Sequence, residues 1–122
     1  MAVSGNIGTY TLPKPEEAVY SEERHPAVIL SKSFKAGQGV IEKGTIVALG
    51  GDGNVVPYNP SASDSTAIPV GVLIERLDTD KETVGNVLVH GVVFRERLIV
   101  AGGSVTEEDL NKLASIGIYN IG

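Results

Sequence analysis

The chain has no cysteine and no tryptophan, and its only histidines are His25 and His90. Without cysteine it can form no disulfide bond, thiol nucleophile or thiolate metal site, and it tolerates either redox compartment. No apolar run approaches the roughly 20 residues that a membrane-spanning helix requires, so we expect no membrane partner. The first residues, MAVSGNIGTYTLPKPEE, lack the basic start and apolar centre of a secretory signal. With no cysteine and two histidines, the chain has few of the side chains that commonly serve in catalysis or metal binding.

Positive charge is also in short supply. The sequence has 10 Lys and Arg residues against 15 Asp and Glu residues, which gives a net charge of -5. Binding to phosphates requires clustered Lys and Arg, so this balance argues against nucleic acid as a partner. Of the 122 residues, 42% are hydrophobic and 20% are charged. That length and composition are typical of one soluble globular domain with a single core.

The first 24 residues differ from the rest of the chain. Their apolar residues follow no lasting period, and Pro13 and Pro15 favour extended backbone. Two of the four tyrosines, Tyr10 and Tyr20, lie here, and aromatic side chains are useful in contacts. We predict an extended N-terminal arm over residues 1–24 and a β-rich domain over residues 25–122. The alternative is a terminal segment without a role.

From Ala27 onward the pattern is that of a β protein. Short runs rich in β-branched residues, among them GTIVAL, NVVPY, PVGVLIERL and GNVLVHGVVFRERLIV, are separated by the turn clusters GGDGN, NPSASDST and DTDKETVG. Gly91 is a candidate bulge or bend in the longest run. Closely spaced short strands predict a mainly β fold, a small barrel or sandwich in one domain.

The last segment, SVTEEDLNKLASIGIYNIG, changes to a helical period. Apolar residues recur at helical spacing between Leu110 and Ala114, which predicts one short C-terminal helix over about residues 105–116. Ser104 with Glu107 is the preferred capping box, and Thr106 with Asp109 is the weaker alternative. The glycine of ASIG fits the left-handed position that closes a helix. An apolar tail follows.

Two glycine-rich stretches need a chemical assessment. In AGQGVIEKGT, Lys43 precedes Gly44 instead of following it, and a strand rather than a helix comes next, so a phosphate loop is not formed. GGDGN contains one acid, Asp52, which is too few for a calcium loop and suits a turn between strands. His90, alone within VLVHGVV, is expected to be packed rather than catalytic. We therefore predict no enzyme activity, no cofactor and no metal.

The alternation of Arg95, Glu96 and Arg97 is the one charge pattern with a candidate role. If the segment is extended, both arginines lie on one face. We predict Arg95 and Arg97 as contacts with a neighbouring copy of the chain.

The order of the segments resembles that of the head decoration proteins of tailed bacteriophages, the lambda-type family. The residues that carry this resemblance are Lys43-Gly44-Thr45, Gly71-Val72-Leu73, Val89-His90-Gly91 and the helix end from Leu110 to Ile118. The resemblance covers about residues 27–119. The individual motifs are short, and their order is the specific feature.

The resemblance implies a capsid-stabilising protein of the virion, made in the host cytoplasm and placed on the outer capsid surface. It implies a homotrimer that binds the major capsid protein after the shell expands and resists the pressure of packaged DNA. It also implies an N-terminal arm that adds a strand to the shell. Arms of this kind share little sequence, so the carry-over is by position only. The expected capsid-binding residues of the arm are Ile7, Thr9, Tyr10, Leu12, Val19 and Tyr20.

A small ligand- or sugar-binding β module, similar to an SAF domain, is the alternative. Such domains also use an Ile-x-x-Gly-x-x-Ile pattern at the start of a strand, and here Ile41 and Gly44 match it while Val47 takes the last position. This alternative predicts a stable monomer and a concave pocket lined by polar residues.

Overall fold

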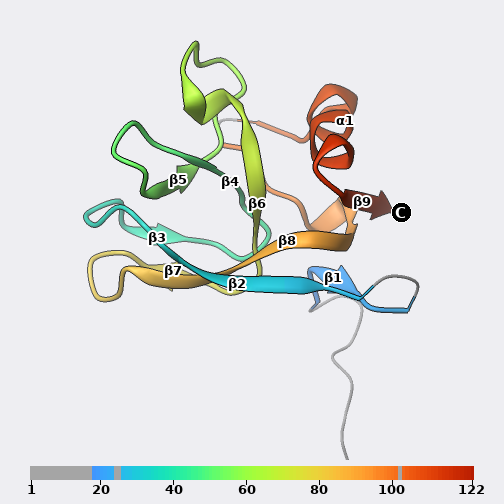
Figure 1. The fold of residues 1–122 in the computed structure, drawn as a ribbon, viewed down its shortest axis with the longest axis horizontal. Helices are drawn as coiled ribbons and strands as arrows, with labels where there is room; N and C mark the ends of the chain where they lie inside the picture. Colours follow the sequence, from blue (N-terminus) through green and yellow to red (C-terminus); the bar gives the residue numbers. More distant parts are fainter. Residues whose placement is uncertain (1–17, 24–25, 102) are drawn as a thin grey trace, which may run out of the picture.

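The computed structural model describes residues 18–23, 26–101 and 103–122. Figure 1 shows α1 and β9 toward one end of the molecule and β3, β5 and β7 toward the other. In chain order the elements are β1 (Tyr20–Ser21), β2 (Val28–Ser33), β3 (Val40–Ile41), β4 (Ile46–Leu49), β5 (Val55–Pro57), the 3₁₀ turn η1 (Ser65–Ala67), β6 (Pro69–Leu73), β7 (Leu77–Asp78), β8 (Val84–Phe94), the 3₁₀ turn η2 (Arg95–Arg97), α1 (Glu107–Ser115) and β9 (Ile118–Ile121).

Strand β8 is the centre of the fold. The main sheet runs in the order β1-β8-β6-β4-β5, and both β2 and β9 also pair with β8. The pairs within this sheet are antiparallel except β8 with β9, which is parallel. Strands β3 and β7 form a separate two-stranded sheet. The predicted mainly β fold with one short helix is confirmed.

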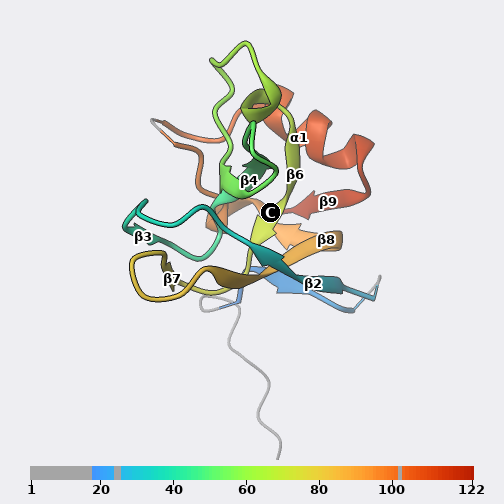
Figure 2. The same ribbon diagram turned by 60° about the vertical axis from the view of Figure 1, so that its left-hand side comes forward.

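The main sheet separates two apolar clusters. Along β4, Ile46 and Ala48 face the first cluster, which also contains Leu110 and Leu113 of α1, whereas Val47 faces the second. This alternation follows from the two-residue period of a strand. The second cluster includes Ile41 of β3 and Leu77 of β7, so the small sheet covers it. Figure 2 shows β3 and β7 on one side and α1 on the other. The arrangement is sandwich-like.

The sheet curls toward closure without becoming a closed barrel. Phe34, directly after β2, forms a parallel bridge with Val55 of β5, and the backbone N–H of Lys35 donates a 3.0 Å hydrogen bond to the carbonyl of Val55. One end of β2 therefore reaches the far edge of the sheet. Phe34 is buried in the second cluster, which fills the interior of the curl.

An irregularity near Gly91 divides β8 into two parts. The register with β2 skips a residue, because Val28 pairs with His90 while Ile29 pairs with Leu88. Beyond this point the faces of β8 exchange, so Leu88 and Val93 both face the first cluster despite their odd spacing. Gly91, with φ of 141°, accommodates the change, as its sequence context predicted. The first part of β8 carries β2 and β6, and the second part carries β1 and β9.

Helix α1 is capped by Thr106 and Asp109, two residues later than the preferred prediction of Ser104 and Glu107. The side chain of Thr106 accepts a 3.2 Å hydrogen bond from the N–H of Asp109, and Asp109 Oδ2 accepts a 2.9 Å bond from the N–H of Thr106. The preference for Ser104 with Glu107 was therefore wrong. Thr106 is the N-cap and Asp109 completes the box from a buried position, whereas Glu107 is exposed. The helix closes at Gly117, whose φ is 90°, as predicted.

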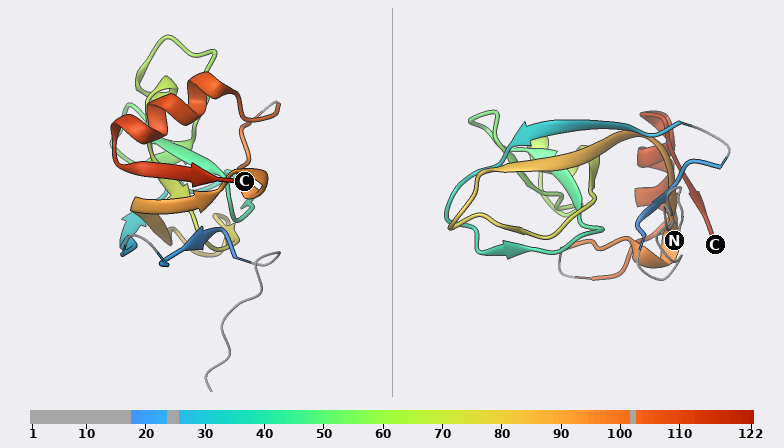
Figure 3. Two further views of the ribbon diagram at one scale, coloured as in Figure 1. Left: turned by 90° about the vertical axis from the view of Figure 1, so that its right-hand side faces the viewer. Right: turned by 90° about the horizontal axis from the view of Figure 1, so that it is seen from below.

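The expected apolar tail after the helix is strand β9. Figure 3 shows β9 running beneath α1 and along the outer part of the sheet. Ile118 is buried in the first cluster, and the residues on either side of Asn120 are exposed.

Candidate functional site

The chain enters the domain at the edge of β8. Val19 is 3% exposed and belongs to the first apolar cluster, and the N–H of Phe94 donates a 2.9 Å hydrogen bond to its carbonyl. Tyr20 pairs with Val93, and Ser21 pairs with Val92. Burial of Val19 and pairing of β1 thus attach these residues, which lie within the segment predicted as the arm, to the sheet.

The predicted arm residues thus fall into two groups. Val19 and Tyr20 anchor the chain to the domain, and Val19 is inaccessible in this arrangement. Tyr20 is half-buried and packs against the first cluster. The predicted capsid contacts Ile7, Thr9, Tyr10 and Leu12 lie outside the described residues.

The C-terminal strand lies on the opposite edge of the same part of β8. Gly91 to Phe94 pair with Ile118 to Ile121, so β1 and β9 flank one segment of β8. Tyr119 is 43% exposed and Ile121 is 42% exposed. The sequence prediction missed this apolar surface, although the alternation in IYNI after the helix-closing glycine was its signal. The arm attachment and an exposed apolar strand are therefore neighbours.

The two predicted arginine contacts have different surroundings. Arg95 Nη2 forms a 2.6 Å ion pair with Glu107 Oε2 at the start of α1. Arg97 Nε is buried and has no hydrogen-bond acceptor among the residues that the structure describes. Both arginines belong to η2, which follows β8 directly, so they also lie close to Phe94 and the arm attachment. The two arginines are therefore close together on one turn, but only Arg95 has an ion-pair partner, whereas Nε of Arg97 is buried without an acceptor among the described residues.

Two glycines of the motifs that carry the resemblance have steric roles. A Cβ at Gly44 would overlap the carbonyl oxygen of Arg97, and the φ of Gly44 is 94°. At Gly71 a Cβ would approach the carbonyl oxygen of Leu88 to 2.7 Å, so glycine allows β6 to lie close to β8. Gly44 and Gly71 therefore permit close approach of neighbouring backbone segments.

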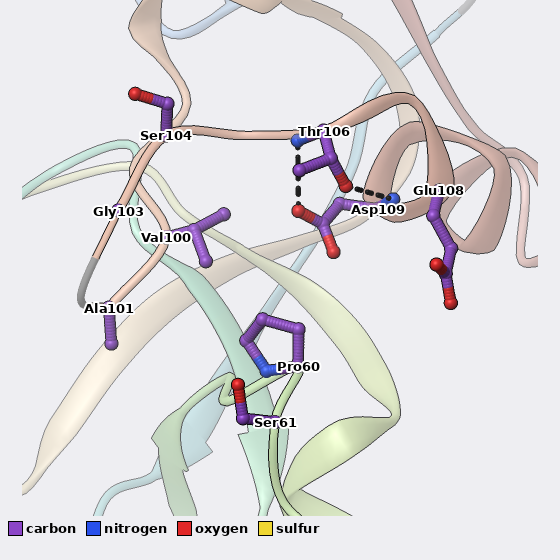
Figure 4. A pocket seen from close by; sticks show the side chains of 9 residues that line it. All are labelled: Pro60, Ser61, Val100, Ala101, Gly103, Ser104, Thr106, Glu108 and Asp109. Atoms are coloured by element: carbon purple, nitrogen blue, oxygen red, sulfur yellow. Dashed lines mark hydrogen bonds between the residues drawn. The ribbon is translucent and has the colours of Figure 1, made fainter.

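A shallow hollow of about 270 Å³ lies beside the start of α1, lined from the segments around Pro60, Val100 and Asp109 (Figure 4). Its polar groups Thr106 and Asp109 are engaged with each other in the capping box, as the dashed lines in the figure show. The two cap residues are therefore occupied by each other, and the remaining polar lining comes from Ser61, Ser104 and Glu108. A shallow hollow beside a helix cap gives no positive support to the alternative of a ligand-binding module.

Asp109 is 2% exposed and is the most deeply buried acid of the domain. Burial raises its pKa, but hydrogen bonds from Tyr58 and Thr106 and the charge of Lys112 outweigh burial, so the pKa lies below the usual value. Burial and the Asp109 carboxylate together raise the pKa of Tyr58 well above that of a free tyrosine. The pair is therefore a fixed carboxylate and a neutral phenol at neutral pH, and its position suits it to join α1 to the sheet.

Within residues 18–23, 26–101 and 103–122, no cluster of histidine and acidic side chains has the arrangement of a metal site. His90 packs against Gly117, where a Cβ would approach its Nδ1 to 2.5 Å. Among the same residues, no helix is long and apolar enough to cross a membrane.

Comparison with known protein families identifies a match over most of the chain. Residues 12–121 match the family model of the bacteriophage lambda head decoration protein D. A comparison with curated proteins found no match. The family match covers most of the chain and includes every strand and the helix of the described residues. The chain therefore belongs to the lambda head decoration protein D family and is a structural component of a phage head.

Proposed function

We propose that this decoration protein binds the outer surface of the expanded capsid as a homotrimer and reinforces the shell against the pressure of packaged DNA. Its N-terminal arm extends onto the major capsid protein and adds a strand there. The observation that supports the proposal is the burial of Val19 and the pairing of β1 with β8, because they attach the C-terminal end of the arm to the sheet.

The anchor is suited to transmit force from the arm to the domain. Val19 is enclosed in the first cluster, and β1 is hydrogen-bonded to the central strand of the sheet. A shell subunit that pulled on the arm would pull against this packing and pairing. Separation of the shell subunits would then require loss of the decoration contacts as well, which is the linkage by which a bound protein stabilises the form that it binds.

The sequence of the arm fits addition to a strand. GTYTL, at residues 8–12, alternates small or hydroxyl side chains with larger ones, and Pro13 ends the run. Residues 1–17 reach at most about 60 Å when fully extended, so the arm can contact the shell at a distance from the domain. Ordering such a segment costs about 1–2 kcal/mol per residue, so binding requires a complementary strand edge.

Repetition compensates for weak individual arms. Once one arm of a trimer is bound, the other two are held close to their sites, and their effective concentration rises. A trimer therefore binds a shell more tightly than three separate chains would. The spacing of the sites must match the trimer, so expansion of the shell can create the binding site.

Co-sedimentation with expanded and unexpanded phage shells tests the proposal. The full chain should bind expanded shells saturably and unexpanded shells weakly or not at all. A variant that lacks residues 1–17 should bind expanded shells more weakly. The deletion must end there, because removal of residues 18–24 would also remove Val19 and β1 from the domain. Equal binding of both proteins to expanded shells would exclude the arm as the contact, and absence of binding would exclude the proposed function for that phage.

Reinforcement has its own measurement. DNA-filled heads should release their DNA at a higher temperature when the protein is bound than when it is absent. The variant lacking residues 1–17, added to equal occupancy, should raise that temperature less. Equal release temperatures with and without the full chain would show that the protein decorates the shell without strengthening it.

A further inference from the structure

Arg97 lies on a backbone that the fold holds rigidly. The N–H of Ile99 donates a 2.8 Å hydrogen bond to the carbonyl of Gly44, and the carbonyl of Ile99 accepts a 3.0 Å bond from Ile46. The carbonyl of Arg97 itself lies against Gly44, where no Cβ fits. The position of Arg97 on the surface is therefore fixed before any partner is bound, which lowers the entropy cost of using it in an interface.

The side chain of Arg97 is not held in the same way. Its Nε is buried without an acceptor among the described residues, and a buried unpaired N–H is unfavourable. Arg95, two residues earlier, is satisfied by its 2.6 Å ion pair with Glu107. A rotation that brings the guanidinium of Arg97 outward to an acceptor would relieve the unpaired N–H. Arg97 therefore gains more than Arg95 from an external carboxylate.

An exposed apolar side chain accompanies Arg97. Leu98 leaves the η2 turn with φ of -78° and ψ of 139°, and Ile99, which follows it, forms a parallel bridge with Thr45. Leu98 and Val100 are buried in the first cluster, and Ile99 is 41% exposed. An exposed aliphatic side chain therefore lies two residues from Arg97 in the sequence. Arginine beside apolar surface is a frequent composition at the centre of protein interfaces.

The charge of the chain indicates the partner. Acidic residues outnumber basic ones by 15 to 10, so a second copy offers an excess of carboxylates to an arginine. In a cyclic trimer each copy presents two different surfaces to its two neighbours, so the surface around Arg97 need not meet another copy of itself. We propose that in the decorated shell Arg97 binds a carboxylate of a neighbouring copy of this chain, beside Ile99, and that Arg95 does not. This inference rests on the proposed homotrimer.

The geometry of the guanidinium defines the contact. Nε and one Nη lie on a single edge and can donate two parallel hydrogen bonds to one carboxylate. Such a pair would satisfy the Nε that is unpaired in the single chain. Lysine at the same place would retain the charge and lose the paired donors.

Carbodiimide coupling on decorated shells tests the contact. Arg97→Lys places an amine where the guanidinium stands, and the reagent joins an amine to a carboxylate in direct contact. Peptide mass spectrometry should find the introduced amine joined to an acidic residue of a second copy of this chain. Arg95→Lys is the matched control, because its amine should couple to Glu107 within the same chain. Both variants should be shown to bind expanded shells before coupling.

The outcomes separate this inference from the proposed function. Coupling of the amine at position 97 to the capsid protein would overturn the inference and assign Arg97 to the shell contact. Absence of coupling between copies at that position, while native lysines still join the copies into trimers, would also overturn it and leave the trimer intact. If no trimers form at full occupancy, the proposed homotrimer itself fails.

A second variant removes the interaction without adding an amine. Arg97→Met should raise the concentration for half-saturation of expanded shells about tenfold or more, and Arg95→Met should leave it within about twofold. Thermal unfolding of both free variants checks that each is folded. An Arg97→Met variant that is folded and binds like the parent chain would overturn the inference.

Discussion

Tyr58 and Asp109 join the sheet to the helix through a 2.7 Å hydrogen bond that the phenol donates to Oδ1 of the carboxylate. The other carboxylate oxygen accepts from the N–H of Thr106, so Asp109 serves the helix cap and the sheet at once. Tyr58 is fully buried in the first cluster. Lys112 lies 3.4 Å from the same phenol oxygen and 5.7 Å from the ring centroid.

Tyr58→Phe should destabilise the domain by about 1–3 kcal/mol, because it removes a donor from a buried carboxylate while preserving the ring. The midpoint of urea unfolding measures the effect. Ser115→Ala, which removes an exposed hydroxyl that donates to the carbonyl of Lys112, is the control and should change stability by less than about 0.5 kcal/mol. Equal midpoints for Tyr58→Phe and the parent chain would contradict the role given to this bond.

Acid should weaken the same network. The pKa of Asp109 is lower in the folded chain than the usual 3.8, so its ionised form contributes stability above that value. The contribution is lost as the pH falls below 3.8 and through the lower pKa of the folded state. The stability advantage of the parent chain over Asp109→Asn should therefore be constant near neutral pH and shrink in acid. Urea midpoints at a series of pH values from neutral to acid measure it, and an advantage that grows in acid would refute the assignment.

Alkali should act through Tyr58. Its pKa is raised in the folded chain above the usual 10.0, so the folded state favours the neutral phenol. The associated stability is present below pH 10.0 and is lost as the pH rises toward the higher pKa of the folded state. Absorbance of the phenolate should show one tyrosine that titrates only when the domain unfolds. Tyr58→Phe should remove that late component, and its persistence in the variant would assign it to another tyrosine.

Gly44→Ala should be strongly destabilising, by more than about 2 kcal/mol. The new Cβ would overlap the carbonyl of Arg97, and the φ of 94° is unfavourable for alanine. Gly53→Ala is the matched control, since Gly53 has a φ of 85° with open space around it. The difference between the two unfolding free energies isolates the steric overlap from the backbone strain. Equal losses in the two variants would show that the overlap is relieved by movement of the 95–99 segment.

Deletion variants test the position at which the arm ends. Removal of residues 1–17 should leave the thermal unfolding temperature nearly unchanged. Removal of residues 1–24 should lower stability by about 2 kcal/mol or more, because it removes the buried side chain of Val19 and the pairing of β1. Val19→Ala in the full chain should reproduce part of that loss. If both deletions have the same stability, β1 contributes nothing to the domain.

The sequence was sufficient for the elements whose signals are local. The runs around Ile46–Leu49, Pro69–Leu73 and Val84–Phe94 are β-branched and bounded by turns, and they form β4, β6 and β8. The helix and its closing glycine were predicted for the same reason. Short strands were missed where only a distant partner stabilises them, as for β3 with β7 and for β1 and β9 beside β8.

The candidate site shows the same limit. The pattern of Arg95 and Arg97 is visible in the sequence, but only the fold gives Glu107 to one and leaves Nε of the other unpaired. The preferred capping box failed because the burial of Asp109 depends on Tyr58, which is distant in the sequence. The hydrogen bond between Phe94 and Val19 is equally non-local and has no signal in the sequence.

The attachment of β1 to β8 has a mechanical consequence. The two strands are antiparallel, and their hydrogen bonds lie across the strand direction. Tension that runs along β1 therefore shears these bonds together instead of opening them one after another. Val19, directly before β1, is buried in the first cluster, so its side chain must leave the core before the strand can slide. The attachment of β1 to β8 would therefore break abruptly at a threshold force, and below that force it would extend very little.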